Sequence, residues 1–232
     1  RACDSAGTQV QRQACDSLPQ LQVCVQHWHR QLFSEWQDAG LYAPVHPDDV
    51  PPKLTAVRGR QLLCALREGP FGAEQVNARL EALFRHAAGD STAGEWYPGR
   101  AVMITRNDAA SGLFNGDIGI CLRDSAGQLS VWFEGVSGLE GGSGPRAFAP
   151  DALPSHEGAF AITVHKSQGS EYGHVAVLLP PDTDNAVLSR QLLYTAATRA
   201  RKSLALWCTE PVLQASLAAR NARSSALPQR LG

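Results

Sequence analysis

The feature that most constrains the fold is an alternation of strand and helix patterns, interrupted by a β-rich stretch. Before the interruption, residues 61–66 form a short apolar run suited to a buried strand, and residues 73–84 follow with helical periodicity. After Pro154 the alternation resumes, with expected strands at 159–164, 175–179 and 204–208 and expected helices at about 189–200 and 211–219. This order predicts the α/β class, with a mainly parallel sheet covered by helices.

The interruption has the pattern of a small, barrel-like insert. Short β-rich runs occur at 101–105, 117–122, 129–133 and 146–148. Turn residues separate them, including Asn115-Gly116 and a glycine-rich loop at 138–144.

The N-terminal region predicts one amphipathic helix followed by a connector. After Asp16 and Ser17, apolar residues recur at steps of three and four along one helical face: Leu18, Leu21, Val25, Trp28 and Leu32. Gly40 is the expected stop. Residues 45–52 contain Pro51 and Pro52, so we expect extended backbone there.

Composition excludes some classes of protein. The net charge of −1 argues against a histone-like coat of positive charge, although a focused nucleic-acid contact stays open. The six cysteines form no CxxC pair, which argues against zinc, and no apolar run approaches the roughly 20 residues of a membrane span. We therefore expect a reduced, cytoplasmic protein. Because it begins at Arg1, we also expect a piece of a longer chain.

Two polar segments are the candidates for chemistry. Residues 163–171 follow an apolar strand and combine hydroxyls, His165, Lys166 and Gly169, which suits phosphate contact or, alternatively, a plain solvated loop. Residues 193–202 are expected to form a helix whose last turn carries three cations. Those cations either match the helix dipole or provide an arginine finger for phosphoryl transfer.

These segments resemble the fifth (163–171) and sixth (194–201) motifs of superfamily 1 helicases, in the usual order. Residues 61–72 (QLLCALREGPFG), followed by Asn77, resemble the fourth-motif region of RecD-type chains, the alpha chains of bacterial exodeoxyribonuclease V. Residues 96–108 and 113–119 are similar to the SH3-like insert of that family. The resemblance covers about residues 55–220.

The resemblance implies a RecA-like parallel sheet with helices on both faces, forming a second motor domain (2A) from residues 53–95 and 150–222. An SH3-like barrel subdomain (2B) would occupy 96–149. Residues 1–52 would be a helical lead-in and linker, and 223–232 a tail.

The resemblance also implies roles for single residues. Arg199 would sense the γ-phosphate as the catalytic finger, with Arg67 as the fourth-motif arginine. Gly169 and Glu171 would approach the nucleotide, while Thr163 and His165 would contact the single-strand backbone. Four residues of the insert would line the DNA path, although a turn-forming role suits them equally: Arg106, Asn107, Phe114 and Asn115.

The sequence contains no GxxxxGK[ST] phosphate loop, so ATP and Mg²⁺ would be bound mainly by a missing N-terminal half. We expect no cofactor, no metal site and no ATPase activity in this chain alone. The implied partners are single-stranded and duplex-end DNA and the beta and gamma chains of exodeoxyribonuclease V, acting in double-strand break repair. Two alternatives remain: a non-enzymatic DNA-binding or assembly module, and a stand-alone RecD-like or relaxase-type helicase.

Overall fold

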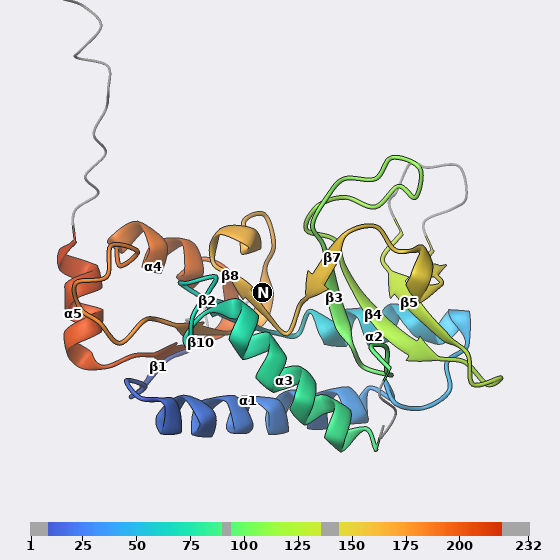
Figure 1. Cartoon of the computed structure of the whole chain (residues 1–232), viewed down its shortest axis with the longest axis horizontal. Coiled ribbons are helices and arrows are strands. Elements are labelled where there is room, and N and C mark those ends of the chain that lie inside the picture. The colour runs from blue at the N-terminus through green and yellow to red at the C-terminus, as the bar shows by residue number, and fades with distance from the viewer. Residues whose placement is uncertain (1–8, 90–93, 136–143, 220–232) are drawn as a thin grey trace, which may run out of the picture.

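A computed structural model describes residues 9–89, 94–135 and 144–219, which form two five-stranded sheets joined through one chain (Figure 1). The tail at 223–232 and nearly all of the expected loop at 138–144 lie outside these residues.

The first sheet is wholly parallel, as the alternation predicted. Its order is β1-β10-β9-β2-β8. The strands are β1 (Gln9–Gln13), β2 (Arg60–Cys64), β8 (Ala161–Thr163), β9 (Tyr172–Leu178) and β10 (Ala200–Trp207). β1 was not predicted, because all five of its residues are exposed and carry no alternating apolar signal. It lies in the region expected to be a helical lead-in, yet it belongs to this sheet.

Helices cover both faces of the parallel sheet. They are α1 (Leu18–Asp38), α3 (Ala73–Ala87), α4 (Arg190–Ala197) and α5 (Glu210–Ala218), whereas α2 (Val50–Val57) packs against α1 and strands of the insert. Figure 1 places α1 and α3 along one side of the sheet and α4 and α5 on the other. Single turns of 3-10 helix occur at Pro47–Asp49, Pro150–Ala152 and His165–Ser167. None of the described helices is both long and apolar enough to cross a membrane.

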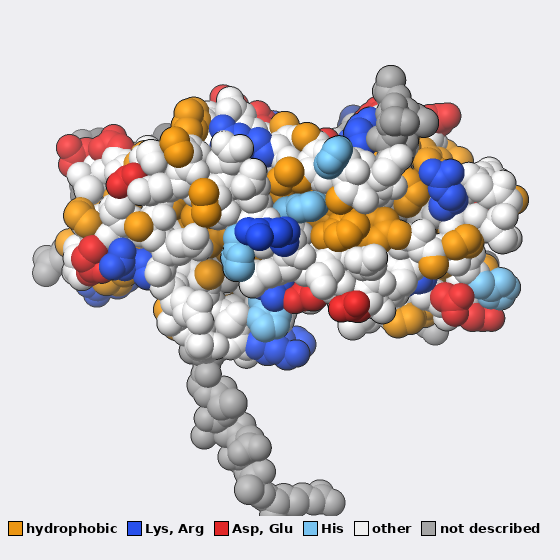
Figure 2. All heavy atoms as spheres, turned by 90° about the horizontal axis from the view of Figure 1, so that it is seen from below, with side chains coloured by type: hydrophobic (Ala, Val, Ile, Leu, Met, Phe, Trp, Pro, Cys, Tyr) orange, Lys and Arg blue, Asp and Glu red, His pale blue; other side chains and the backbone are white. Residues whose placement is uncertain are grey.

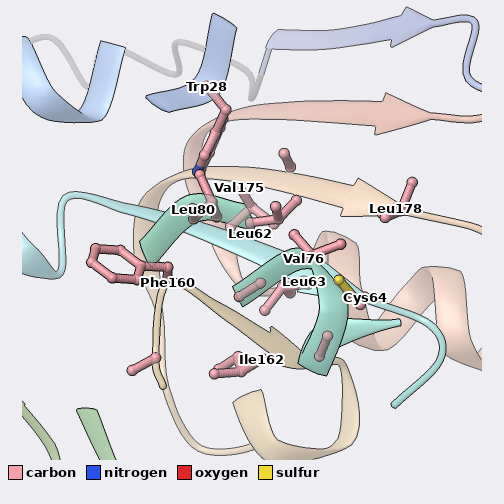
Figure 3. Close-up of a cluster of buried hydrophobic side chains, with 14 of the residues drawn as sticks. Trp28, Leu62, Leu63, Cys64, Val76, Leu80, Phe160, Ile162, Val175 and Leu178 are labelled. Carbon is pink, nitrogen blue, oxygen red and sulfur yellow. The ribbon is translucent and has the colours of Figure 1, made fainter. Parts of the chain in front are cut away.

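The main core lies between α1, α3 and the parallel sheet. Val76 and Leu80 of α3 belong to this core together with Leu62 and Leu63 of β2, and all four are fully buried (Figure 3). The expected face of α1 is confirmed except at Leu18, which is exposed in the first turn. The face of the molecule seen from below has cationic and histidine side chains gathered near its middle, beside a patch of hydrophobic side chains (Figure 2).

The expectation of extended backbone at 45–52 was wrong. Pro47–Asp49 form a 3-10 turn, and α2 begins at Val50 with both prolines in its first turn. Proline fits there because the first N–H groups of a helix have no partner within the helix, and the fixed φ of proline suits a helix start.

The expected helix at 189–200 ends earlier, at Ala197. The Thr198 hydroxyl donates to the Thr195 carbonyl, and the Arg199 N–H donates to the Ala196 carbonyl, which closes the last turn. Arg201 and Lys202 therefore lie in β10 and not in a helical turn, so the dipole explanation for their charge does not apply.

The insert is a second, antiparallel sheet in the order β6-β5-β4-β3-β7. Its strands are β3 (Ala101–Ile104), β4 (Ile118–Arg123), β5 (Leu129–Phe133), β6 (Arg146–Phe148) and β7 (His156–Gly158). The first four match the expected β-rich runs, whereas the polar β7 was not predicted. Among the described residues β6 and β7 are not paired, so this sheet is open and does not establish an SH3-like barrel.

His29 makes the stability of the core sensitive to pH. Its ring is buried edge-on against Phe84, with 4.5 Å between the ring centroids. Burial, reinforced by Arg30, lowers its pKa below the ordinary 6.5. Because the folded pKa is lowered, the contribution of His29 to stability is present above about pH 6.5 and is lost as the pH falls through the folded value.

We therefore expect the free energy of unfolding to fall between pH 7 and pH 5, by at most about 1.4 kcal/mol per pH unit for this group. Urea unfolding at both pH values measures the effect. His29→Phe should weaken the pH dependence, whereas His27→Phe, at an exposed position of the same helix, should not. An unchanged pH dependence in His29→Phe would contradict this assignment.

Candidate functional site

The loop after β8 is held in a tight conformation by hydrogen bonds to β2 and within the loop. The Val164 N–H donates to the Cys64 carbonyl at the end of β2, and the buried Ser167 hydroxyl donates to the Val164 carbonyl at 2.7 Å. Gly169 then has a φ of +88°, which favours glycine, and open space surrounds its α-carbon. The chain can therefore turn sharply and still leave its backbone accessible to a ligand.

Two grooves open on either side of this loop. The insert groove lies between the loop and the antiparallel sheet, and its lining includes Asn115, His165, Gly169, Glu171 and Lys202. The α3 groove is lined by residues including Arg67, Asn77, Glu157 and Thr163. Lys166 lines both grooves.

The structure brings together most of the residues singled out from the sequence. Asn115, His165, Gly169 and Glu171 share the insert groove, and Thr163 and Arg67 share the α3 groove. The other four line neither groove: Arg106, Asn107 and Phe114 are exposed on the insert, and Arg199 is partly buried after α4.

In the insert loop, side chains organise the turn. Asn107 Oδ1 accepts from the Asn115 N–H, and Asp117 Oδ2 accepts from the Phe114 N–H, both at 2.8 Å. These contacts favour the turn-forming role for Asn107. Phe114 remains 43% exposed and is available for contact.

Arg199 connects the two candidate segments. Its guanidinium donates to the Ser170 carbonyl at 3.0 Å, to the Thr195 carbonyl at 3.2 Å and to the Thr198 hydroxyl at 3.1 Å. The Arg199 carbonyl in turn accepts from the Tyr172 N–H at 2.8 Å. These bonds use three of the five guanidinium N–H donors and hold the side chain at the junction of the two segments.

Two other candidate residues, Glu171 and Arg67, form ion pairs with neighbouring side chains. The Arg201 guanidinium lies 2.6 Å from Glu171 Oε2, and Arg67 Nε donates to Glu74 Oε1 at 2.8 Å. The Glu74 carboxylate raises the pKa of Arg67. Arg67 therefore remains cationic, but both pairs are well exposed and easily exchanged.

The two grooves are close to neutral in this state. Among the described residues six cationic side chains line them: Arg58, Arg67, Arg100, Lys166, Arg201 and Lys202. Six carboxylates line them too: Glu74, Glu81, Asp117, Glu134, Glu157 and Glu171. Lys166 was expected to suit phosphate contact, whereas no role was expected for Glu157. Lys166 lies within a segment singled out from the sequence, but no sequence signal placed Glu157 beside it.

The described residues contain no group of three or more His, Cys, Asp or Glu side chains that could hold a metal ion. Within 9–89, 94–135 and 144–219, all five cysteines are free and buried. Burial raises the pKa of the Cys64 thiol to about 12, so this thiol is not a reactive nucleophile near neutral pH.

Comparison with known proteins gives consistent matches. A family described as UvrD-like helicase C-terminal domain matches residues 158–207, which include both candidate segments. The RecBCD enzyme subunit RecD of Mycobacterium tuberculosis is 37% identical, covering 77% of this chain and 30% of that protein. The ATP-dependent RecD2 DNA helicase of Deinococcus radiodurans is 36% identical, covering 74% of this chain and 23% of that protein.

This chain therefore spans less than a third of either relative. Among solved structures, Pif1 helicase from Bacteroides, in complex with ADP-AlF3 and ssDNA, is 16% identical with a TM-score of 0.33. That match covers 78% of this chain and 50% of the Pif1 chain, and it is too weak to support an argument.

Proposed function

Since this chain belongs to the RecD-type superfamily 1 helicases, we propose that it supplies the second motor lobe of an ATP-dependent DNA helicase that moves 5′ to 3′. The other lobe, with the phosphate loop, would come from sequence outside these 232 residues. This chain alone would not hydrolyse ATP, because no GxxxxGK[ST] segment is present.

One observation carries the proposal: the Arg199 guanidinium is bonded to the Ser170 carbonyl in the loop after β8. If Arg199 moved when it bound a nucleotide, its bond to Ser170 would therefore transmit the movement to the loop that carries His165 and Thr163. In a motor, a contact of this kind would couple the nucleotide to the grip on DNA.

The residues at this edge suit a phosphate group. Arg199 retains two N–H donors, and Gly169 leaves its backbone open to close approach. ATP would supply the phosphoryl group, and Arg199 would stabilise the negative charge that develops on it. Mg²⁺ would be bound mainly by the other lobe, together with the nucleotide phosphates.

Two assemblies are compatible with this function. We favour the alpha chain of exodeoxyribonuclease V, acting with beta and gamma chains on duplex ends in the cytoplasm during double-strand break repair. The similarity to a RecD2 helicase supports a stand-alone enzyme as the second candidate. Co-purification of beta and gamma chains with the tagged full-length protein would support the first, and a lone active chain the second.

Single-strand binding by this chain tests the DNA contact. We expect Thr163→Val and His165→Ala each to weaken binding of a fluorescent oligothymidylate about fivefold, because each removes roughly one hydrogen bond to the backbone. Fluorescence anisotropy at low salt measures the affinity. His27→Ala, on the distant outer face of α1, is the matched control and should bind like the unmodified chain. Equal affinity in all four proteins would remove this part of the proposal.

A further inference from the structure

One ion pair lies at the junction of the two grooves. Lys166 Nζ is 2.6 Å from Glu157 Oε1. Lys166 lies in the 3-10 turn after β8, whereas Glu157 lies in β7, opposite Met103 of the antiparallel sheet. The pair therefore connects the loop after β8 to the insert.

This pair is better shielded than the other exchangeable pairs of the grooves. The side chains of Lys166 and Glu157 are 33% and 32% exposed, against 47% and 44% for Arg58 and Glu134. The pairs of Arg67 and Arg201 are more exposed still. The side chain of Arg100 is only 9% exposed, so its guanidinium is not available to a ligand. Because solvent screens exposed charges, Lys166 is the available cation whose charge is most strongly held by a carboxylate.

Lys166 also lies beside both residues expected to contact the strand. Thr163 lines the α3 groove, His165 lines the insert groove, and Lys166 lines both. A strand that contacts both Thr163 and His165 would therefore come close to Lys166. Its ammonium group is the natural contact for a phosphate at this point.

We propose that Glu157 occupies the place of a DNA phosphate on Lys166, so that single-strand binding requires exchange of this carboxylate for a backbone phosphate. This inference rests on the proposed function. Glu157 is thus a positioning residue that sets the affinity for the strand. It also keeps the grooves neutral when no DNA is bound.

The test is the affinity of Glu157→Gln for a fluorescent oligothymidylate. With Lys166 released, we expect about fivefold tighter binding at low salt. Because Lys166 contacts the phosphate in both complexes, the slope of log Kd against log salt concentration should change by less than the roughly 0.7 that a whole phosphate contact contributes. Fluorescence anisotropy at several salt concentrations gives both quantities.

Two comparisons separate the specific exchange from a general loss of negative charge. Glu134→Gln removes a carboxylate from the insert groove, where it pairs with the exposed Arg58, and should tighten binding less than twofold. In a Lys166→Gln background, Glu157→Gln should no longer tighten binding, because its partner is absent. A gain that persists in that background would overturn the proposal.

Glu157→Asp provides a second variant that keeps the charge but shortens the side chain, and it should tighten binding by a smaller factor. Melting temperatures identify any variant that has lost its fold. If the unmodified chain binds but neither variant at 157 binds more tightly, the proposed exchange of Glu157 for a phosphate is wrong, and the proposed function stands. If neither the unmodified chain nor any variant binds single strands, both are rejected.

Discussion

Replacing Arg199 with alanine, in a protein that also carries the phosphate-binding lobe, is expected to lower ATP turnover about a thousandfold. The affinity for single strands should stay within about twofold. The physical reason is that a guanidinium presented from the opposite lobe neutralises charge that develops only in the transition state. Steady-state ATPase rates with saturating oligothymidylate, together with anisotropy titrations, measure both quantities.

The position of Arg199 requires a control for loop structure, because its guanidinium also holds the Ser170 carbonyl. Arg190→Ala is the matched variant: this arginine begins α4 and likewise donates to a backbone carbonyl, that of Leu217. It should leave turnover nearly unchanged. If Arg199→Ala weakened DNA binding as strongly as it lowered turnover, Arg199 would only support the loop, and the finger assignment would be lost.

Arg199→Lys refines the same test. A lysine keeps the positive charge but cannot donate to several oxygens in one plane, so turnover should recover only in small part. Full recovery would show that charge alone suffices at this position.

Most of the predicted strands bury apolar residues, whereas the two strands that were missed do not. β2 and β9 have buried apolar cores, and their apolar runs identified them. β1 and β7 are polar and are held at sheet edges by backbone pairing. Backbone hydrogen bonds carry no residue preference strong enough to recognise such strands in a single sequence.

The candidate site divides in the same way. Thr163, His165 and Gly169 could be named from one contiguous segment because local chemistry and family resemblance coincide there. Pairings across the fold could not: Arg201 meets Glu171 thirty residues away, and Lys166 meets Glu157 of a strand that was not predicted. Neutrality of the grooves is a property of these tertiary pairings, so a count of charges along the chain does not reveal it.

The second large effect concerns Phe84, on which the aromatic core converges. Its ring is fully buried and stacks on Phe160 with 4.4 Å between centroids and a 10° interplanar angle. It also contacts Trp36 and the edge of the His29 ring. Through these contacts α3 is joined to α1 and to the residue just before β8, whose loop carries the candidate site.

Phe84→Ala should therefore lower the free energy of unfolding by about 3–5 kcal/mol, through lost burial and the cavity left behind. For a domain of ordinary stability, that loss is a large fraction of the total. Urea unfolding monitored by tryptophan fluorescence measures it, with Leu217→Ala, at a 40% exposed position of α5, expected within about 0.5 kcal/mol of the unmodified chain. A loss below about 1 kcal/mol in Phe84→Ala would show that the Phe84 ring contributes little to the packing of α3 against α1 and Phe160.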